Sequence, residues 1–421
     1  MGLETTTTIS GLNETWPLGT DPRNEGDNHI RTTKTVLKNT FDDGTAGELK
    51  IKVGGSTALV VNADGSLENA SGKLLGVTAQ AYNRVVNGAM QHSQENGDAT
   101  TAAVTNFVYW PADQWTTAWS LSPGTVVSQR LSGVTPNNSS KVLYLGISTA
   151  KPSLGASDYF FTEHKLEGAR VADFQWGTAT ARQVVLRFWV WAQVAGTYSI
   201  QLQNSAADRS YIAGFTVAAG EASTWKQVVL VIPGDTTGTW LKDNGLGIVL
   251  RFVWAQGSTS LGVAGWQAGN KIGLTGQSNG AATAMTNIQI ADVGLYLDPD
   301  ATGVPPKWVP PDYASELAAC RRYWARNFSA HGVWSSATTT FRTVFPLKQP
   351  MRVAPTLTVS NAAGAIEEYN VAFRDLGALP AISCSTAIDS VESFSVTTAA
   401  ATAIGKNGGL LSERLIFNAR M

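Results

Sequence analysis

The chain has 421 residues, of which only 15% are charged, and its formal net charge is −1. This length suggests two or three domains with a large buried core. The weak charge argues against a nucleic-acid-binding role, which needs a positive field. Cys320 and Cys384 are the only cysteines, too few for a disulfide framework or a structural zinc site. They form either one bridge or two buried free thiols.

The N-terminus lacks the basic and apolar leader of a signal peptide. No apolar run approaches the length of about 18 residues that a membrane-spanning helix needs. From the sequence we therefore expect a soluble protein that is made in the cytoplasm and does not insert into a membrane.

The first element expected is a helix within residues 1–45. Asp27 is a plausible N-cap, and Ile30, Leu37 and Phe41 recur at helical spacing with Val36 beside them. No partner helix follows, so we expect this apolar stripe to pack on copies of itself or on another protein.

Residues 46–80 predict a short β stalk. The runs Leu49–Val53 and Ala58–Asn62 alternate between apolar and polar residues, separated by two glycines. A lone hairpin is marginally stable in water. Without a third strand, pairing between chains is expected, most simply around a threefold axis.

Residues 81–300 predict a β-sandwich built around the stretch Arg182–Trp266. One face of its clearest strand is entirely apolar, through Val184, Leu186, Phe188, Val190, Ala192 and Val194, and the other carries Val185, Arg187, Trp189, Trp191 and Gln193. This period of two indicates a strand. The small pair Ala195-Gly196 predicts a hairpin in which residues 198–202 return beside it.

Further strands are expected on both sides of this stretch. They cover residues 107–115, 142–147, 159–166, 211–217, 225–232, 246–254 and 286–297. The loop of residues 233–247 is rich in Gly, Asp, Asn and Thr, which is typical of the end of a sandwich. Many short strands broken by turns predict two antiparallel sheets, with a jelly roll preferred.

Residues 301–327 predict a proline-rich linker and a helix. Two Pro-Pro pairs interrupt regular structure, and the helix is expected over Tyr313–Arg326 with Asp312 as its N-cap. Residues 328–421 return to a strand pattern and predict a C-terminal β tip domain. Its strands are expected at residues 339–346, 355–359, 369–373, 393–397 and 414–420.

Several sequence segments, taken together, resemble a known family. The order of residues 187–191 (RFWVW), 196–199 (GTYS), 234–240 (GDTTGTW) and 316–323 (ELAACRRY) is similar to tailed-bacteriophage tail fibres, receptor-binding proteins with a carbohydrate-binding-module-like β-sandwich. Residues 25–31 and 37–41 resemble their attachment region, and residues 345–356 resemble their tip. Residues 82–90 are similar to the opening strand of their receptor-binding module, which implies a strand there. The resemblance implies a homotrimer, a place in the virion tail, and attachment to other tail or baseplate proteins through residues 1–45.

Candidate ligand residues lie in or near the loops of the sandwich. Trp240 and Trp266 offer flat faces for a pyranose, and Asp243 and Asn244 offer hydrogen-bonding groups for its hydroxyls. No sequence motif for a cofactor, a metal or a catalytic nucleophile is visible, so none is expected. Asp235 and Asp243 are the best carboxylate pair for a glycosidase.

The expected function is host adsorption. In this interpretation, a non-catalytic tail fibre or tail-tip protein recognises cell-surface polysaccharide. Two alternatives stay open, namely a purely structural tail or baseplate component and a capsule-degrading glycosidase.

Overall fold

Strand β10 (Val184–Ala192) has the two-sided pattern that its sequence predicts. Val184, Leu186, Phe188, Val190 and Ala192 are completely buried, whereas Trp189 and Trp191 on the opposite face are partly exposed. Period-two alternation therefore identified the strand and its core face correctly.

The chain is described by a computed structural model, which covers residues 23–42, 49–53, 56–62, 67–69, 82–133, 135–334, 340–359, 366–369, 373–375, 381–386, 390–397 and 407–421. It divides into two units. One holds Met1–Tyr82 and Tyr296–Lys307, and the other holds Asn83–Leu295 and Trp308–Met421.

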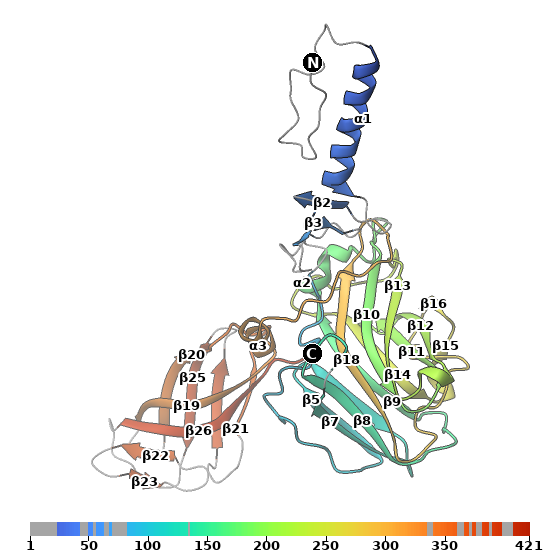
Figure 1. Cartoon of the computed structure of the whole chain (residues 1–421). Helices are drawn as coiled ribbons and strands as arrows, with labels where there is room; N and C mark the ends of the chain where they lie inside the picture. The colour runs from blue at the N-terminus through green and yellow to red at the C-terminus, as the bar shows by residue number, and fades with distance from the viewer. Residues whose placement is uncertain are drawn as a thin grey trace. The chain divides into compact units, whose positions relative to one another are not determined.

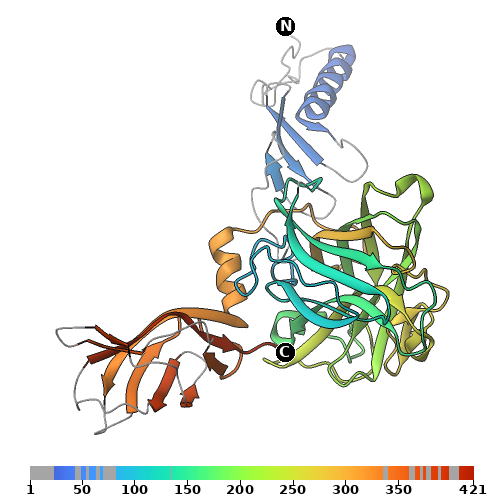
Figure 2. The same ribbon diagram turned by 90° about the horizontal axis from the view of Figure 1, so that it is seen from below.

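Two large sheets form the sandwich of the second unit (Figures 1 and 2). Over the described residues, the first sheet has the order β13-β10-β18-β8-β7 and the second β16-β12-β11-β14-β9-β6-β5. The other strands of the first sheet are β7 (Thr125–Ser132), β8 (Lys141–Thr149), β13 (Trp225–Ile232) and β18 (Thr286–Leu297). Those of the second are β5 (Asn106–Ala112), β6 (Trp115–Ser120), β9 (Tyr159–Glu167), β11 (Gly196–Gln203), β12 (Arg209–Val217), β14 (Leu246–Gln256) and β16 (Gly265–Ala268).

Short elements complete the sandwich unit. They are α2 (Gly168–Val171), η3 (Ala172–Phe174), η4 (Ala219–Glu221), η5 (Ser258–Ser260), β15 (Leu261–Gly262) and β17 (Gly273–Leu274).

Aromatic side chains join the two sheets across the core. The Phe188 ring of the first sheet lies 5.2 Å from Phe215 and 4.9 Å from Phe252 of the second, measured between ring centroids. Both contacts are edge-to-face, the geometry that aromatic pairs favour. The prediction of an all-β, antiparallel sandwich is confirmed.

The predicted hairpin of β10 and β11 is wrong. β10 pairs with β13, whereas β11 pairs with β12 and β14 in the opposite sheet. Tyr198, Ile200 and Leu202 are buried like the apolar face of β10. Because both strands have an apolar face to bury, they lie in opposite layers, and the connection at residues 193–195 passes from one sheet to the other.

The segment 82–90, predicted as an opening strand, forms turns. Asn87 and Met90 both adopt positive φ, at 57° and 56°, a conformation that interrupts a strand and that Asn tolerates well. The region 298–312 contains no helix or strand, in agreement with the predicted linker.

Helix α3 (Tyr313–Arg321) begins where the sequence predicts. The Asp312 side chain accepts a hydrogen bond from the Ser315 amide at 2.9 Å, which is N-cap geometry. The predicted end at Arg326 is wrong, because β19 begins at Trp324. Cys320 on this helix is a buried free thiol, and the Cys384 side chain lies outside the described residues.

The C-terminal region forms one further sheet, as predicted. Its described strands are β19 (Trp324–Trp334), β20 (Thr340–Pro346), β21 (Thr356–Val359), β22 (Ile366–Tyr369), β23 (Phe373–Asp375), β24 (Ala381–Thr386), β25 (Ser390–Thr397) and β26 (Asn407–Asn418). The strand expected at residues 369–373 is wrong, because β22 ends and β23 begins there.

The first unit contains α1 (Arg23–Thr40), which begins four residues before the predicted N-cap Asp27. Its Val36 is buried, whereas Ile30 and Leu37 are 56% and 45% exposed. None of its described helices is long and apolar enough to cross a membrane, and the same holds in the other unit.

The stalk sheet of this unit is complete within one chain. Strands β1 (Phe41–Asp42), β2 (Leu49–Val53), β3 (Ser56–Val61) and β4 (Leu67–Asn69) pair in that order. The expectation of a hairpin with no third strand is therefore wrong, since β1 and β4 flank it. Pairing between chains around a threefold axis stays a prediction.

Candidate functional site

Asn87 closes the loop that forms one wall of a cavity in the second unit. Its buried side-chain amide donates to the carbonyl oxygens of His92 and Asp113, at 2.8 and 2.9 Å, and its Oδ1 accepts from the His92 amide at 3.0 Å. One side chain thus satisfies three backbone groups, so the loop of residues 87–92 holds one conformation.

Asp113 fixes the next part of the same loop. Its carboxylate accepts from the backbone amide of Gln94 at 2.9 Å and from the side-chain Nε2 at 2.8 Å. Burial raises the pKa of Asp113, although the two bonds from Gln94 oppose the shift. Asp113 therefore positions the loop, because both of its carboxylate oxygens accept hydrogen bonds from Gln94.

Strands β7 and β8 supply two cations to the cavity. Arg130 Nε lies 2.7 Å from one oxygen of Asp98, and Lys141 Nζ lies 2.6 Å from the other. Arg130 also donates to the Gln91 carbonyl at 2.5 Å. Burial works to raise the pKa of Asp98, but the bonds from Lys141 and Arg130 outweigh it and lower this pKa. The single Asp98 carboxylate therefore forms ion pairs with both cations.

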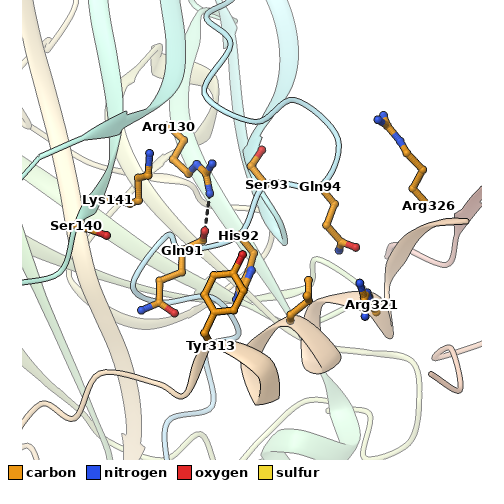
Figure 3. A pocket seen from close by; sticks show the side chains of 11 residues that line it. Gln91, His92, Ser93, Gln94, Arg130, Ser140, Lys141, Tyr313, Arg321 and Arg326 are labelled. Carbon is orange, nitrogen blue, oxygen red and sulfur yellow. Dashed lines mark hydrogen bonds between the residues drawn. The ribbon is translucent and has the colours of Figure 1, made fainter. Parts of the chain in front are cut away.

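Helix α3 forms the opposite wall. Tyr313, Leu317 and Arg321 follow one another at intervals of four residues, which places them on one helix face, and all three line the cavity. The Tyr313 ring is 63% exposed and lies 4.4 Å from the His92 ring. Figure 3 shows these two rings side by side, with Arg130 and Lys141 beyond them.

The cavity has a volume of about 620 Å³, within the range of about 300–1,000 Å³ common for small-molecule sites. No Asp or Glu is among its described lining residues, which are Gln91, His92, Ser93, Gln94, Arg130, Ser140, Lys141, Tyr313, Leu317, Arg321 and Arg326. Four cations therefore meet amide and hydroxyl groups and one exposed aromatic ring.

Four polar atoms of this lining are buried without a hydrogen-bond partner in the protein, namely Gln91 Oε1, His92 Nε2, Ser93 Oγ and Arg326 Nε. Buried polar groups usually have partners, and each unpaired one costs stability. His92 is only 3% exposed, and this burial lowers its pKa, so the imidazole is neutral at neutral pH. The four unpaired atoms have almost no accessible surface, so they lie behind the surface of the cavity and not on it.

The two tryptophans predicted to bind sugar lie together but are engaged in packing. Trp240 is 8% exposed, and its ring lies 4.9 Å from Trp176 and 5.5 Å from Trp266. Trp266 is partly exposed, and its indole N–H donates to the Pro233 carbonyl at 2.8 Å. The three rings form an edge-to-face cluster beneath the loop.

The other two predicted residues contact different partners. Asp243 Oδ1 accepts from the Gly245 amide at 2.8 Å, and Asn244 Oδ1 accepts from Arg322 at 3.4 Å. These contacts hold Asp243 within the loop and Asn244 against Arg322. That these four residues bind carbohydrate stays a prediction.

Asp235, one member of the predicted carboxylate pair, is occupied by Arg209. The guanidinium donates to both carboxylate oxygens, at 2.9 and 2.8 Å, and Thr237 donates to Oδ1 as well. Burial works to raise the pKa of Asp235, but the bonds from Arg209 and Thr237 outweigh it and hold this pKa below its usual value. Asp235 thus has a structural role, in which it holds the start of the loop to Arg209.

The cavity residues were missed by reasoning from sequence. They come from three regions of the sequence, namely Gln91–Gln94, Arg130 to Lys141, and Tyr313 to Arg321, and the first and last of these residues are 230 positions apart. The only local signal was Asn87-Gly88, a pair typical of a turn, within a segment that was assigned to a strand.

Comparison with known proteins leaves the family open. No family model matches the chain, and no curated protein gives a significant match. Among solved structures, the enzymatically active domain of tailspike protein 4 from bacteriophage CBA120 is 13% identical, with a TM-score of 0.28 over 51% of this chain. The match spans 21% of that tailspike chain, so it concerns about a fifth of its length.

Carbohydrate-binding modules are also found. TmCBM61, solved with β-1,4-galactotriose, is 9% identical, with a TM-score of 0.25 over 52% of this chain and 99% of its own. The family 11 module of Clostridium thermocellum is 12% identical, with a TM-score of 0.24 over 46% of this chain and 97% of its own. Similarities at this level carry no argument about ligand or activity.

Proposed function

We propose that this chain is a non-catalytic tail fibre or tail-tip protein of a virion that recognises host cell-surface polysaccharide, and that the cavity beside α3 is its binding site. The observation that supports this is Tyr313, an exposed aromatic ring in a cavity that is also lined by amide and hydroxyl side chains. Saccharides bind through a flat ring against their C–H face and through polar groups on their hydroxyls.

The lining favours binding over hydrolysis. Glycosidases generally place two carboxyl groups about 5–10 Å apart across the scissile bond. The described lining of this cavity offers cations and neutral groups instead. In the proposal, adhesion is strengthened by several copies acting together, because tethered weak sites gain effective concentration.

Attachment and assembly belong to the same proposal. Ile30 and Leu37 on α1 are large apolar side chains left exposed within one chain. Such a stripe suits a contact with other copies or with a tail or baseplate protein through residues 1–45. A homotrimer, made in the host cytoplasm and incorporated into the tail, is the assembly we propose.

Two assays of the full chain test this function. An array of bacterial capsular and O-antigen polysaccharides should show selective binding, and the bound glycan should release no new reducing ends. Absence of binding to every glycan would favour the purely structural tail component. Release of reducing ends would identify a glycosidase.

A further inference from the structure

The cavity has more cationic side chains than carboxylates paired with them. Arg130 and Lys141 share the single carboxylate Asp98. Arg321 and Arg326 also line the cavity, and no ion pair joins either of them to a carboxylate in the described part of the chain. The site therefore has a surplus of positive charge facing the place where a ligand would lie.

Arg321 differs from its neighbour Arg322 in this respect. Arg322 donates to both oxygens of Glu167, at 2.9 and 2.6 Å, and so holds the helix to the sandwich. The Arg321 guanidinium has neither a hydrogen bond nor an ion pair with the described residues, although its side chain is half-buried at the cavity. Its fork of N–H donors is available for a planar anion.

The other lining groups narrow the kind of anion. Tyr313 offers an exposed ring, and Gln91, Gln94 and Ser140 offer amide and hydroxyl side chains. An inorganic phosphate or sulfate has no apolar face to lie against the ring. Sugar hydroxyls both donate and accept, and a sugar ring can also stack on Tyr313.

We propose, resting on the function inferred above, that the cavity selects an acidic saccharide residue, a hexuronic acid whose carboxylate is held by Arg321. The ring of this residue lies against Tyr313, and its hydroxyls bond to the amide and hydroxyl groups of Gln91, Gln94 and Ser140. Arg130 and Lys141 add a positive field. The polysaccharide recognised on the host is accordingly an acidic one.

The test uses pairs of glycans on the full chain. Glucuronate- and galacturonate-containing tetrasaccharides are each compared with their carboxyl-reduced forms by isothermal titration calorimetry. The acidic member of a pair should bind at least about tenfold more tightly, equivalent to about 1.4 kcal/mol. Inorganic phosphate at the same concentration should not displace it.

Two arginine variants locate the effect. Arg321→Gln should weaken binding of the acidic glycan by about tenfold or more. The matched control is Arg182→Gln, which removes the same charge from an exposed position outside the cavity and should leave binding unchanged. Equal losses for both variants would show a general charge effect and overturn the proposal.

The outcomes separate the two proposals. Equal affinity for acidic and carboxyl-reduced glycans would overturn the hexuronate site, and so would unchanged affinity of the Arg321→Gln variant for the acidic glycan. In either case the polysaccharide-binding function stands. If neither the acidic nor the neutral members bind, and the wider array is also empty, both proposals fail.

Discussion

Arg322 forms a two-pronged ion pair with Glu167, with N–O distances of 2.9 and 2.6 Å. The Glu167 side chain is 1% exposed and also accepts from the Tyr323 hydroxyl at 3.0 Å. The pair joins the end of α3 to the end of β9. It therefore anchors the end of the helix that forms one wall of the cavity to the sandwich.

Removing this pair should destabilise the protein strongly. Arg322→Gln leaves a buried carboxylate without its cation, which costs about 3–5 kcal/mol. Urea unfolding at neutral pH measures the loss. Arg321→Gln is the matched control one position away and should change stability by no more than about 0.5 kcal/mol. Similar losses for the two variants would contradict the different roles assigned to the two arginines.

The core between the sheets gives a second prediction. Phe188→Ala removes a fully buried ring in contact with Phe215 and Phe252 and should cost about 3–5 kcal/mol. Gln193→Ala, at an exposed position, should cost far less. Thermal unfolding of the two variants compares them, and equal shifts would refute the assignment of a buried and an exposed side to residues 184–193.

His164 should make stability depend on pH. Burial lowers its pKa from 6.5 to about 3, although the bond of its Nε2 to the Val86 carbonyl at 2.9 Å partly opposes the shift. The native state then excludes a proton that the unfolded chain accepts below about pH 6.5. This contribution to stability is complete above that pH and is lost as the pH falls from about 6.5 towards 3.

The variant His164→Gln isolates that effect. Between pH 6.5 and 5 the wild type should lose up to about 2 kcal/mol more than the variant, because glutamine has no proton to take up. Urea unfolding at the two pH values gives the difference. Parallel losses in both proteins would show that His164 does not titrate as its burial implies.

Trp240→Ala tests the loop site that the sequence suggested. Since Trp240 is buried against Trp176 and Trp266, its removal should cost about 3–5 kcal/mol. Calorimetric melting and glycan affinity should be measured on the same sample. Unchanged stability with lost glycan binding would instead support the loop as the sugar site.

The assembly prediction concerns α1. Burial of Ile30 and Leu37 between copies would make the full chain a trimer at micromolar concentration, which multi-angle light scattering measures. Ile30→Glu together with Leu37→Glu should shift the mass towards the monomer, because each places a charge in an apolar contact. A wild-type monomer would contradict the proposed homotrimer.

Local pattern was sufficient to predict much of this fold. The alternation of β10, the bounds of β13 and β18, and the Asp312 cap all follow from residues adjacent in sequence, which determine side-chain direction and capping directly. Strand partners do not follow in this way. β10 and β11 have the sequence pattern of a hairpin. Whether two such strands pair with each other or lie in opposite sheets depends on which apolar faces meet across the core.

The cavity was beyond local reasoning for the same reason. The turn at Asn87 depends on its bonds to His92 and Asp113, and the helix wall depends on the Arg322–Glu167 pair. Neither contact can be inferred from spacing. Tryptophan content directed attention to the sandwich loops, whereas the exposed ring at the cavity is Tyr313.

The affinity of two variants for polysaccharide, one at a tyrosine and one at a phenylalanine, tests the account most directly. Tyr313→Ala removes the ring at the cavity, and Phe107→Ala removes a ring that is 44% exposed on β5 and does not line it. With a capsular or O-antigen polysaccharide that the wild type binds, we expect Tyr313→Ala to lose about tenfold or more in affinity, which is about 1.4 kcal/mol. Phe107→Ala should bind as the wild type does. Full affinity in Tyr313→Ala would contradict the assignment of this cavity as the binding site.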